Sequence, residues 1–157
     1  MKHHKGQIIA IDFMLTMAVT AIIIILLVST FIFYEKKIDE STSYNLMLTK
    51  AFQVSDILIK TQGSPTNWNA SNVDVIGLVS EDRMISSEKL NQFINMPEQD
   101  IKKRFTMNYN FYFNLKNTGG NSLASVGTIP SGTRTVVIKR YVLYENDKTI
   151  MEFAVWE

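Results

Sequence analysis

The chain has 157 residues and a formal net charge of +1, which fits one domain with a modest core and calls for no nucleic-acid partner. It has no Cys, and its two histidines, His3 and His4, both precede a long apolar run. Disulfides, thiolate chemistry, most catalytic triads and most zinc sites are therefore excluded. We expect no enzymatic activity, no metal site and no cofactor. A hydrolase that uses only carboxylates is the enzymatic alternative.

The apolar run extends from Phe13 to Tyr34, 22 residues without a charged side chain. As a helix it would be about 33 Å long, enough to cross a bilayer core of roughly 30 Å. Buried core helices usually have shorter apolar stretches, and the apolar cores of ordinary secretory signals are shorter too. The run therefore predicts a single membrane-spanning helix.

Flanking charges predict the orientation of this helix. Lys2 and Lys5 precede the run with no acid beside them, whereas acids outnumber bases in the stretch that follows it. The positive-inside rule then keeps the N-terminus in the cytoplasm. We expect the chain from about residue 35 onward to be extracellular, on the outer side of the cell membrane.

The helical pattern continues beyond the membrane. Residues 35–60 contain no Gly and no Pro, and Gln62-Gly63-Ser64-Pro65 supplies a helix stop. We predict one helix of about 50 residues, with 7–34 as its hydrophobic part and 35–62 as an amphipathic continuation. A soluble coiled coil is the alternative, but the apolar stripe spans too few turns for one. The stripe, expected to be buried, consists of Tyr44, Met47, Leu48, Ala51, Val54 and Leu58.

The remaining chain covers residues 63–157. For its first half, the sequence predicts a loop, a short strand and two short helices. Residues 66–71 are expected to form an exposed loop in which Trp68 tucks against the helix, with stacking on a ligand as the alternative role of Trp68. Residues 73–79 are expected to form a short strand. Ser86 is the natural N-cap of a short helix. Pro97 begins a second helical segment. The inward side chains of these two helices are expected to be Leu90, Phe93, Ile94, Ile101 and Phe105.

The second half predicts an antiparallel sheet. Apolar and polar side chains alternate over residues 108–115, the period of a half-buried strand. Residues 133–144 and 148–156 are β-rich and are joined by Glu145-Asn146-Asp147 as a hairpin. Residues 117–132 are rich in Gly, Ser and Asn and predict a linker without core residues. The expected fold class is α+β, with the outer half of a long N-terminal helix packed on a small antiparallel sheet.

The beginning of the chain resembles a known family. Lys5-Gly6-Gln7, followed by an apolar helix with one early acid, is similar to the class III signal sequence of archaeal type IV pilins and pilin-like proteins. The long first helix, the exit at Gly63 and Pro65, and the C-terminal hairpin suit the type IV pilin-like plan. Residues 62–68 running into 75–78 also look like a segment of archaeal pilin-like membrane proteins. Ile9 and Ile11 occupy positions where the family commonly has a small residue and an acid.

The resemblance implies how the N-terminus is processed and what Asp12 does. In that family a membrane prepilin peptidase cuts between the Gly and the Gln, which makes 1–6 a cytoplasmic leader peptide. The cut would free the α-amino group of Gln7, and the early acid, here Asp12, would pair with such an amine between helices of a filament. The alternative is that Asp12 lies in the first turn of an uncut helix, favoured by the helix dipole and hydrated at the membrane interface.

Two other features have structural and functional interpretations. Asn69 belongs to the one N-x-[ST] sequon and is a candidate N-glycosylation site; an unmodified loop is the alternative. The basic groups 102–104 and 139–140 are interpreted as solvated surface, since a phosphate-binding patch needs more basic residues on one surface. No nucleic acid is expected as a partner.

Together these observations predict a structural subunit, major or minor, of an archaeal type IV pilus-like cell-surface filament. Its expected partners are other copies or related pilins through the N-terminal helix, the prepilin peptidase and the membrane. The alternative is an unassembled single-pass membrane-anchored protein that displays the head as an extracellular binding module.

Overall fold

The computed structural model describes residues 3–132 and 134–157, with side chains described from residue 11 onward apart from residue 133. The fold is α+β, as the sequence predicts. A helix of 58 residues, α1 (His3–Lys60), precedes a six-stranded sheet and two short helices. The chain divides into two compact units, Met1–Ser43 and Tyr44–Glu157, and α1 contributes to both.

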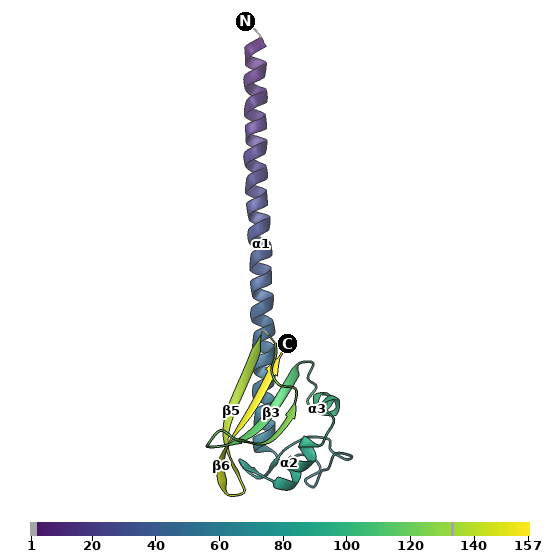
Figure 1. Ribbon diagram of the computed structural model, residues 1–157. Coiled ribbons are helices and arrows are strands. Elements are labelled where there is room, and N and C mark those ends of the chain that lie inside the picture. The colour runs from purple at the N-terminus through teal and green to yellow at the C-terminus, as the bar shows by residue number, and fades with distance from the viewer. Residues whose placement is uncertain (1–2, 133) are drawn as a thin grey trace. The chain divides into compact units, whose positions relative to one another are not determined.

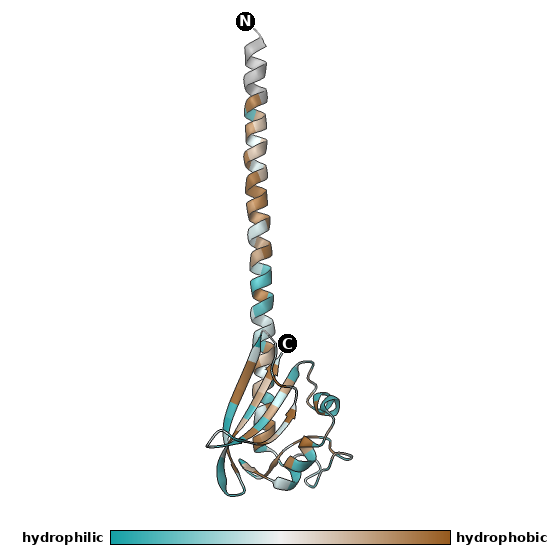
Figure 2. Ribbon diagram, viewed as in Figure 1, coloured by the Kyte–Doolittle hydropathy of each residue, from teal (hydrophilic) through white to brown (hydrophobic). Residues whose placement is uncertain are grey.

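The described part of the first unit belongs to α1, and the long helix predicted from the sequence is confirmed. It continues without interruption because no Gly or Pro occurs between Gln7 and Gln62. Thr16, Thr20 and Thr30 donate their hydroxyls to the carbonyl oxygen four residues earlier, at 2.7–2.8 Å. These threonines therefore satisfy their own hydrogen bonds within the helix. Figure 2 shows the hydrophobic colouring that dominates this part of α1.

In the second unit the last turns of α1 pack against the sheet (Figure 1). Four members of the predicted stripe are buried, and a fifth, Leu48, is partly buried. The prediction is wrong for Tyr44, which is 44% exposed, because burial of the stripe begins one turn later. The four buried members are Met47, Ala51, Val54 and Leu58.

The sheet has the strand order β1-β2-β5-β6-β3-β4. The long strands β5, β6, β3 and the edge strand β4 pair antiparallel, whereas β2 pairs parallel to β5 over two residues only. The strands are β1 (Val79–Glu81), β2 (Met84–Ile85), β3 (Asn110–Asn117), β4 (Ser122–Gly127), β5 (Thr135–Tyr144) and β6 (Asp147–Trp156).

The antiparallel strands predicted from alternation and turn residues are confirmed. Phe111, Phe113 and Leu115 of β3 are completely buried. The hairpin between β5 and β6 turns at Glu145 and Asn146, whose φ angles of 51° and 69° are those of a tight two-residue hairpin loop. The strong alternation in β3 and the turn chemistry therefore predicted both features correctly.

Two predictions about strands are wrong. Residues 117–132 contain β4, whose Ala124 and Val126 are only partly buried against the core, so its apolar signal is weak. The strand predicted over residues 73–79 is wrong up to Leu78: residues 73–78 make one isolated bridge, Val75 to Ser64, and β1 begins only at Val79. Buried Val73, Ile76 and Leu78 lack the alternation of a strand because this segment is anchored as an irregular loop.

The two predicted short helices are confirmed as α2 (Ser87–Ile94) and α3 (Glu98–Arg104). The Ser86 hydroxyl accepts a hydrogen bond from the Lys89 backbone N–H, as expected of an N-cap. Phe93 of α2 packs edge-on against Phe113 of β3, with ring centroids 5.2 Å apart. Of the five side chains expected to face inward, four are buried and Ile94 is partly buried against the core.

A polar cluster fixes the point where α1 ends. The Trp68 indole N–H donates to the carbonyl oxygens of Gln62 and Gly77, at 3.2 and 2.9 Å. The Lys89 ammonium donates to the carbonyl oxygens of Gln62 and Val79, and burial lowers the pKa of this group. Trp68 is almost fully buried, which confirms that it tucks the loop against the helix end.

We predict that Ala51→Glu destabilises the second unit by about 3–5 kcal/mol or prevents its folding, because the substitution places an unpaired charge in the core. Ala51 is completely buried on α1. Both tryptophans, Trp68 and Trp156, lie in the second unit, so tryptophan fluorescence during thermal unfolding in detergent measures its stability. The matched control is Gln53→Glu, two residues later on the exposed side of the helix. Equal stability of the Ala51→Glu protein and the parent would contradict the packing.

Candidate functional site

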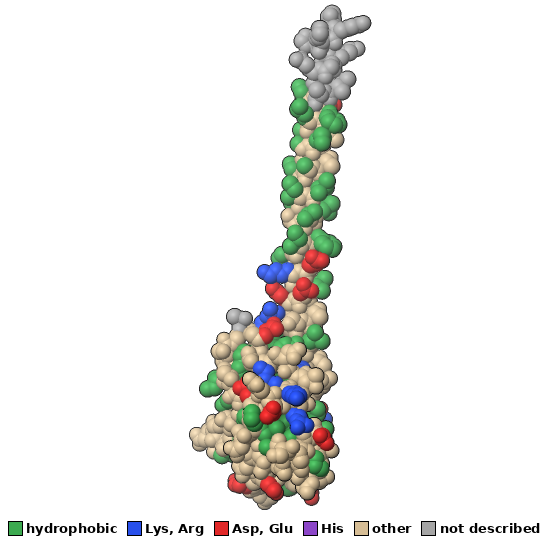
Figure 3. All heavy atoms as spheres, turned by 90° about the vertical axis from the view of Figure 1, so that its right-hand side faces the viewer, with side chains coloured by type: hydrophobic (Ala, Val, Ile, Leu, Met, Phe, Trp, Pro, Cys, Tyr) green, Lys and Arg blue, Asp and Glu red, His purple; other side chains and the backbone are tan. Residues whose placement is uncertain are grey.

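The first candidate feature is the exposed apolar surface of α1. From Ile11 to Tyr34 the large apolar side chains are 48–71% exposed, and no other described part of the chain covers them. By length and composition, α1 is the one helix among the described residues that could cross a membrane. Figure 3 shows apolar side chains along this segment, followed by basic and acidic ones. An exposed apolar surface of this size is typical of a segment that contacts lipid or another protein.

Asp12 is the single acid of this segment. Its side chain is exposed, and its backbone carbonyl accepts the hydroxyl of Thr16 at 2.8 Å. No described residue forms an ion pair with it. The backbone of Gly6 and Gln7 belongs to α1, but their side chains, and any contact of the predicted processing site, lie outside the described residues.

Asn69 lies in the loop that follows α1 and is exposed. Its side-chain oxygen accepts hydrogen bonds from the backbone N–H groups of Ser71 and Asn72, at 2.9 and 3.2 Å, which closes a local turn. The sequon therefore lies at the surface, in a turn that presents the Asn69 amide to solvent.

The basic groups noted in the sequence do not form one surface patch. Lys139 pairs with Glu152 at 2.9 Å, whereas its neighbour Arg140 pairs with Asp56 of α1 at 2.8 Å. On α3, the Arg104 guanidinium lies 3.8 Å from Asp74. Neighbouring side chains of a strand point to opposite faces of the sheet, so the two β5 cations pair with different acids, although both line one cavity beside the end of α1.

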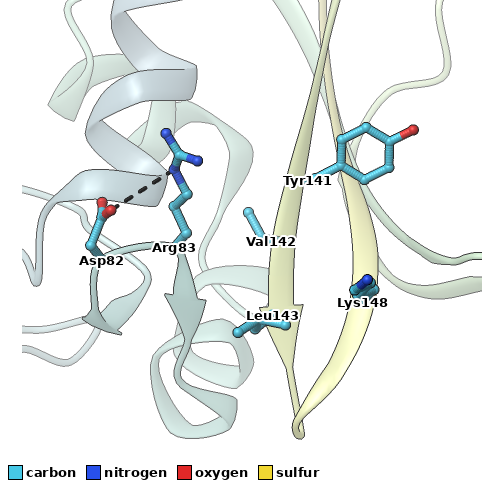
Figure 4. Close-up of a pocket in the computed structure, with 6 residues that line it drawn as sticks. All are labelled: Asp82, Arg83, Tyr141, Val142, Leu143 and Lys148. Atoms are coloured by element: carbon cyan, nitrogen blue, oxygen red, sulfur yellow. Dashed lines mark ion pairs between the residues drawn. The ribbon is translucent and has the colours of Figure 1, made fainter.

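A groove that the sequence did not predict lies in the second unit between β5, the β1–β2 turn and the last turn of α1. It consists of two cavities, of about 520 and 340 Å³, which share the side chains of Arg83 and Tyr141. Figure 4 shows the larger cavity, with Arg83 from the β1–β2 turn facing Val142 and Leu143 of β5. No motif or periodicity indicates this groove, because its lining residues come from three separate segments.

Arg83 connects the three walls of the groove. Its φ of 58° turns the chain between β1 and β2. In that conformation its N–H donates to the Ile59 carbonyl of α1 at 3.0 Å, and its carbonyl accepts the Leu143 N–H of β5 at 2.8 Å. The backbone thus holds the helix end and the strand together, while the Arg83 side chain remains mostly exposed beside Asp82, 3.9 Å away.

Asp56 balances the cations at the base of the smaller cavity. It accepts hydrogen bonds from Lys60 at 2.7 Å and from Arg140 at 2.8 Å. The hydrogen bond from Lys60 lowers the pKa of Asp56 against the opposing effect of desolvation, and the charges of Lys60, Arg140 and Arg83 lower it further. Arg140 also lies over the Phe52 ring, 5.3 Å from its centroid, and its buried Nε has no partner among the described residues.

Glu152 forms a second charged cluster on the outer face of the sheet. The Glu152 carboxylate forms ion pairs with the ammonium groups of Lys116, at 2.6 Å, and Lys139, at 2.9 Å. Burial alone would raise the pKa of Glu152, but the hydrogen bonds from the two lysines outweigh it and hold the pKa below the ordinary 4.5. Among the described residues no three His, Cys, Asp or Glu side chains gather as metal ligands.

We predict that Glu152→Gln lowers the free energy of unfolding at pH 7 by about 1–2 kcal/mol, because two charge-assisted hydrogen bonds are weakened. The folded-state pKa of Glu152 is depressed, so its contribution is present above pH 4.5 and is lost as the pH falls through the folded pKa. The variant should therefore lose less stability than the parent between pH 5 and pH 3. Denaturant titrations at these pH values measure the difference. Glu81→Gln, at an exposed position of β1, is the control and should leave both quantities unchanged.

Two places in the described chain therefore carry chemistry that the core does not use: the exposed apolar segment with Asp12, and the groove around Arg83 and Tyr141. Comparisons with protein-family models, with curated proteins and with solved structures found no match to this chain.

Proposed function

We propose that this protein is a pilin-like structural subunit of a cell-surface filament, assembled through the apolar part of α1. One observation carries the proposal: the apolar side chains of residues 11–34 are exposed, whereas later turns of the same helix bury their apolar stripe against the sheet. The helix thus has one apolar stretch that the chain covers and one that needs cover from outside. A bilayer before assembly and the helices of other copies after assembly would both supply it.

The charges around the segment support an orientation for the subunit. Lys2 and Lys5 precede it, and a mixed, slightly acidic stretch from Glu35 to Glu40 follows it. By the positive-inside rule the N-terminus stays in the cytoplasm and the second unit is outside the cell. Lys5-Gly6-Gln7 would then lie on the cytoplasmic side, where a prepilin peptidase could cut between Gly6 and Gln7.

Asp12 supports assembly rather than simple anchoring. A carboxylate among apolar helices is costly unless it is paired and hydrogen-bonded, and no described residue pairs with Asp12. Cleavage after Gly6 would create a cation at Gln7, a partner that a neighbouring copy could offer. The pair would set the stagger between subunits more than it would add net stability.

The second candidate function is a membrane-anchored binding module that never assembles. The groove beside β5 favours it, since a cavity of about 520 Å³ on the second unit is large enough to hold a ligand. Electron micrographs of sheared surface material from cells with and without the protein separate the two functions. Filaments that contain the chain support the subunit, and an exclusively membrane-bound chain supports the module.

We predict that Gly6→Val blocks cleavage in cells that carry a prepilin peptidase, because a β-branched residue restricts the extended backbone that a protease site needs. The mass of the isolated chain measures this directly: the parent should begin at Gln7 and the variant at Met1. Gly6→Ala, which adds a side chain without β-branching, is the control and should be cut. An uncut parent chain in such cells would contradict the processing site.

We predict that Asp12→Ala leaves membrane insertion intact but abolishes incorporation into filaments. Removing a carboxylate makes the segment more apolar, while the Gln7 amine loses its partner. Asp12→Asn should restore assembly only in part, because it keeps the shape and hydrogen bonding without the charge. The measurement is the ratio of sheared filament protein to membrane-bound protein.

Asp39→Ala, an acid beyond the apolar run, is the control for Asp12→Ala and should assemble normally. Filament yield from Asp12→Ala equal to that of the parent would mean that Asp12 is only a hydrated residue of the first helical turns.

A further inference from the structure

Strand β5 has an unpaired edge. Its partner β2 pairs with Leu143 and Tyr144 only, so the part of β5 before Leu143 has no strand on that side among the described residues. On the opposite side β6 pairs with β5 along its whole length. The sheet is therefore incomplete where β2 ends and Arg83 turns the chain away.

The hydrogen bonds show which backbone groups point to this open edge. The Leu143 N–H donates toward β2, to the Arg83 carbonyl, whereas the Val142 carbonyl faces β6 and accepts the Thr149 hydroxyl. Backbone groups alternate between the two edges of a strand. Tyr141, Lys139 and Val137 precede Leu143 in steps of two, so they present their N–H and C=O groups to the same open edge.

The open edge coincides with the groove. The smaller cavity lies between the last turn of α1 and β5, and Lys139 and Tyr141 line it together with Ile59 and Lys60. The larger cavity continues past Arg83 along Val142 and Leu143 (Figure 4). Tyr141, which lines both cavities, is the most exposed large apolar or aromatic side chain described, at 77%. There is space at the point where the backbone groups lack partners.

The charges around the groove select its occupant. Five cationic side chains line the two cavities, but only two acidic ones do, Asp56 and Asp82. Asp56 is already paired with Lys60 and Arg140, and Asp82 lies 3.9 Å from Arg83. Arg83 has one long ion pair, to Asp82, and Lys148 has no ion pair among the described residues. The five cations are Lys60, Arg83, Lys139, Arg140 and Lys148.

We propose that this groove binds an extended peptide segment with acidic side chains, which adds to the sheet as a strand beside β5. The three edge-facing residues span Val137 to Tyr141, so a segment of about five to seven residues fills the site at roughly 3.3 Å per residue. The backbone groups of β5 supply the hydrogen bonds of strand addition, and Arg83 and Lys148 select for carboxylates. The site does not depend on filament assembly, so it stands or falls separately from the proposed function.

The experiment uses the full-length protein in nanodiscs of neutral phosphatidylcholine. The probe is a fluorescent heptapeptide of alternating valine and aspartate, and its binding is measured by anisotropy. We expect saturable binding, at least tenfold tighter than that of the same peptide with lysine in place of aspartate. No saturable binding at peptide concentrations up to about 1 mM, or equal binding of the two peptides, would overturn the proposal.

Backbone methylation separates strand addition from attraction between charges. Two further peptides carry N-methyl groups on the residues of one edge or of the other edge of the strand. Because an added strand uses one edge only, one of them should bind like the parent peptide and the other at least tenfold more weakly. Equal binding or equal loss for the two peptides contradicts strand addition.

Protein variants locate the site. Lys139→Pro removes the edge-facing N–H and should weaken binding at least tenfold, whereas Lys139→Ala keeps that N–H and should weaken it only a few-fold. Arg83→Asn removes the charge but tolerates the positive φ, and should weaken binding at least fivefold even if the proline variant does not fold. Arg104→Asn, on α3, is the matched control. Unchanged binding by Arg83→Asn overturns the assignment.

A lipid surface is the competing occupant of a basic groove. Vesicles of phosphatidylglycerol are therefore added to the preformed peptide complex. Retention of the bound peptide supports the proposal, and complete displacement by the vesicles assigns the groove to anionic lipid headgroups instead.

Discussion

The rest of the structure depends on one constraint: a single helix carries two apolar surfaces, and the chain covers only one of them. Burial of a large apolar side chain is worth about 1.5–3 kcal/mol, so the exposed run from Ile11 to Tyr34 represents tens of kcal/mol. A folded domain is stable by only about 5–15 kcal/mol. The free-energy cost of leaving this run in water would therefore be larger than the free energy of unfolding of the whole fold. The protein is thus expected where lipid or other apolar helices surround the run.

The second unit solves a different problem, which is to close a small core around one helix face. Leu58 and its neighbours supply one side of this core, and β3 and β6 supply the other. The cluster of Trp68 and Lys89 at the end of α1 fixes where the chain leaves the helix. Gly77 is required there, because a β-carbon at this position would overlap the backbone carbonyl oxygen of Thr61. The short β2 follows from the same anchoring, since Arg83 is tied to Ile59 and can extend the sheet no further.

The features that could be predicted from the sequence are those whose signal lies within a single helix, strand or turn. The absence of Gly and Pro between Gln7 and Gln62 and the alternation around Phe111 each act within one element, so α1, β3 and the β5–β6 hairpin were predicted correctly. β4 was missed because an edge strand with Ala124 and Val126 buries too little apolar surface to produce a pattern. The groove was missed because Ile59, Arg83 and Tyr141 meet only after the chain has folded.

Asp12 is the one carboxylate of the run from Ile11 to Tyr34, and its need for a partner differs from that of the other polar side chains in the run. Thr16, Thr20 and Thr30 already donate to carbonyl oxygens of their own helix, so they need no partner when water is removed. An ionised carboxylate has no hydrogen to donate to a backbone carbonyl. It therefore needs a cation, a proton or water from outside its helix. Whatever covers the run must therefore provide for one charge near its beginning. A bilayer meets that need by keeping Asp12 near the hydrated headgroups. A second copy can meet it only by placing a cation at the level of Asp12 along the helix axis. That requirement would set the stagger between the subunits of a filament.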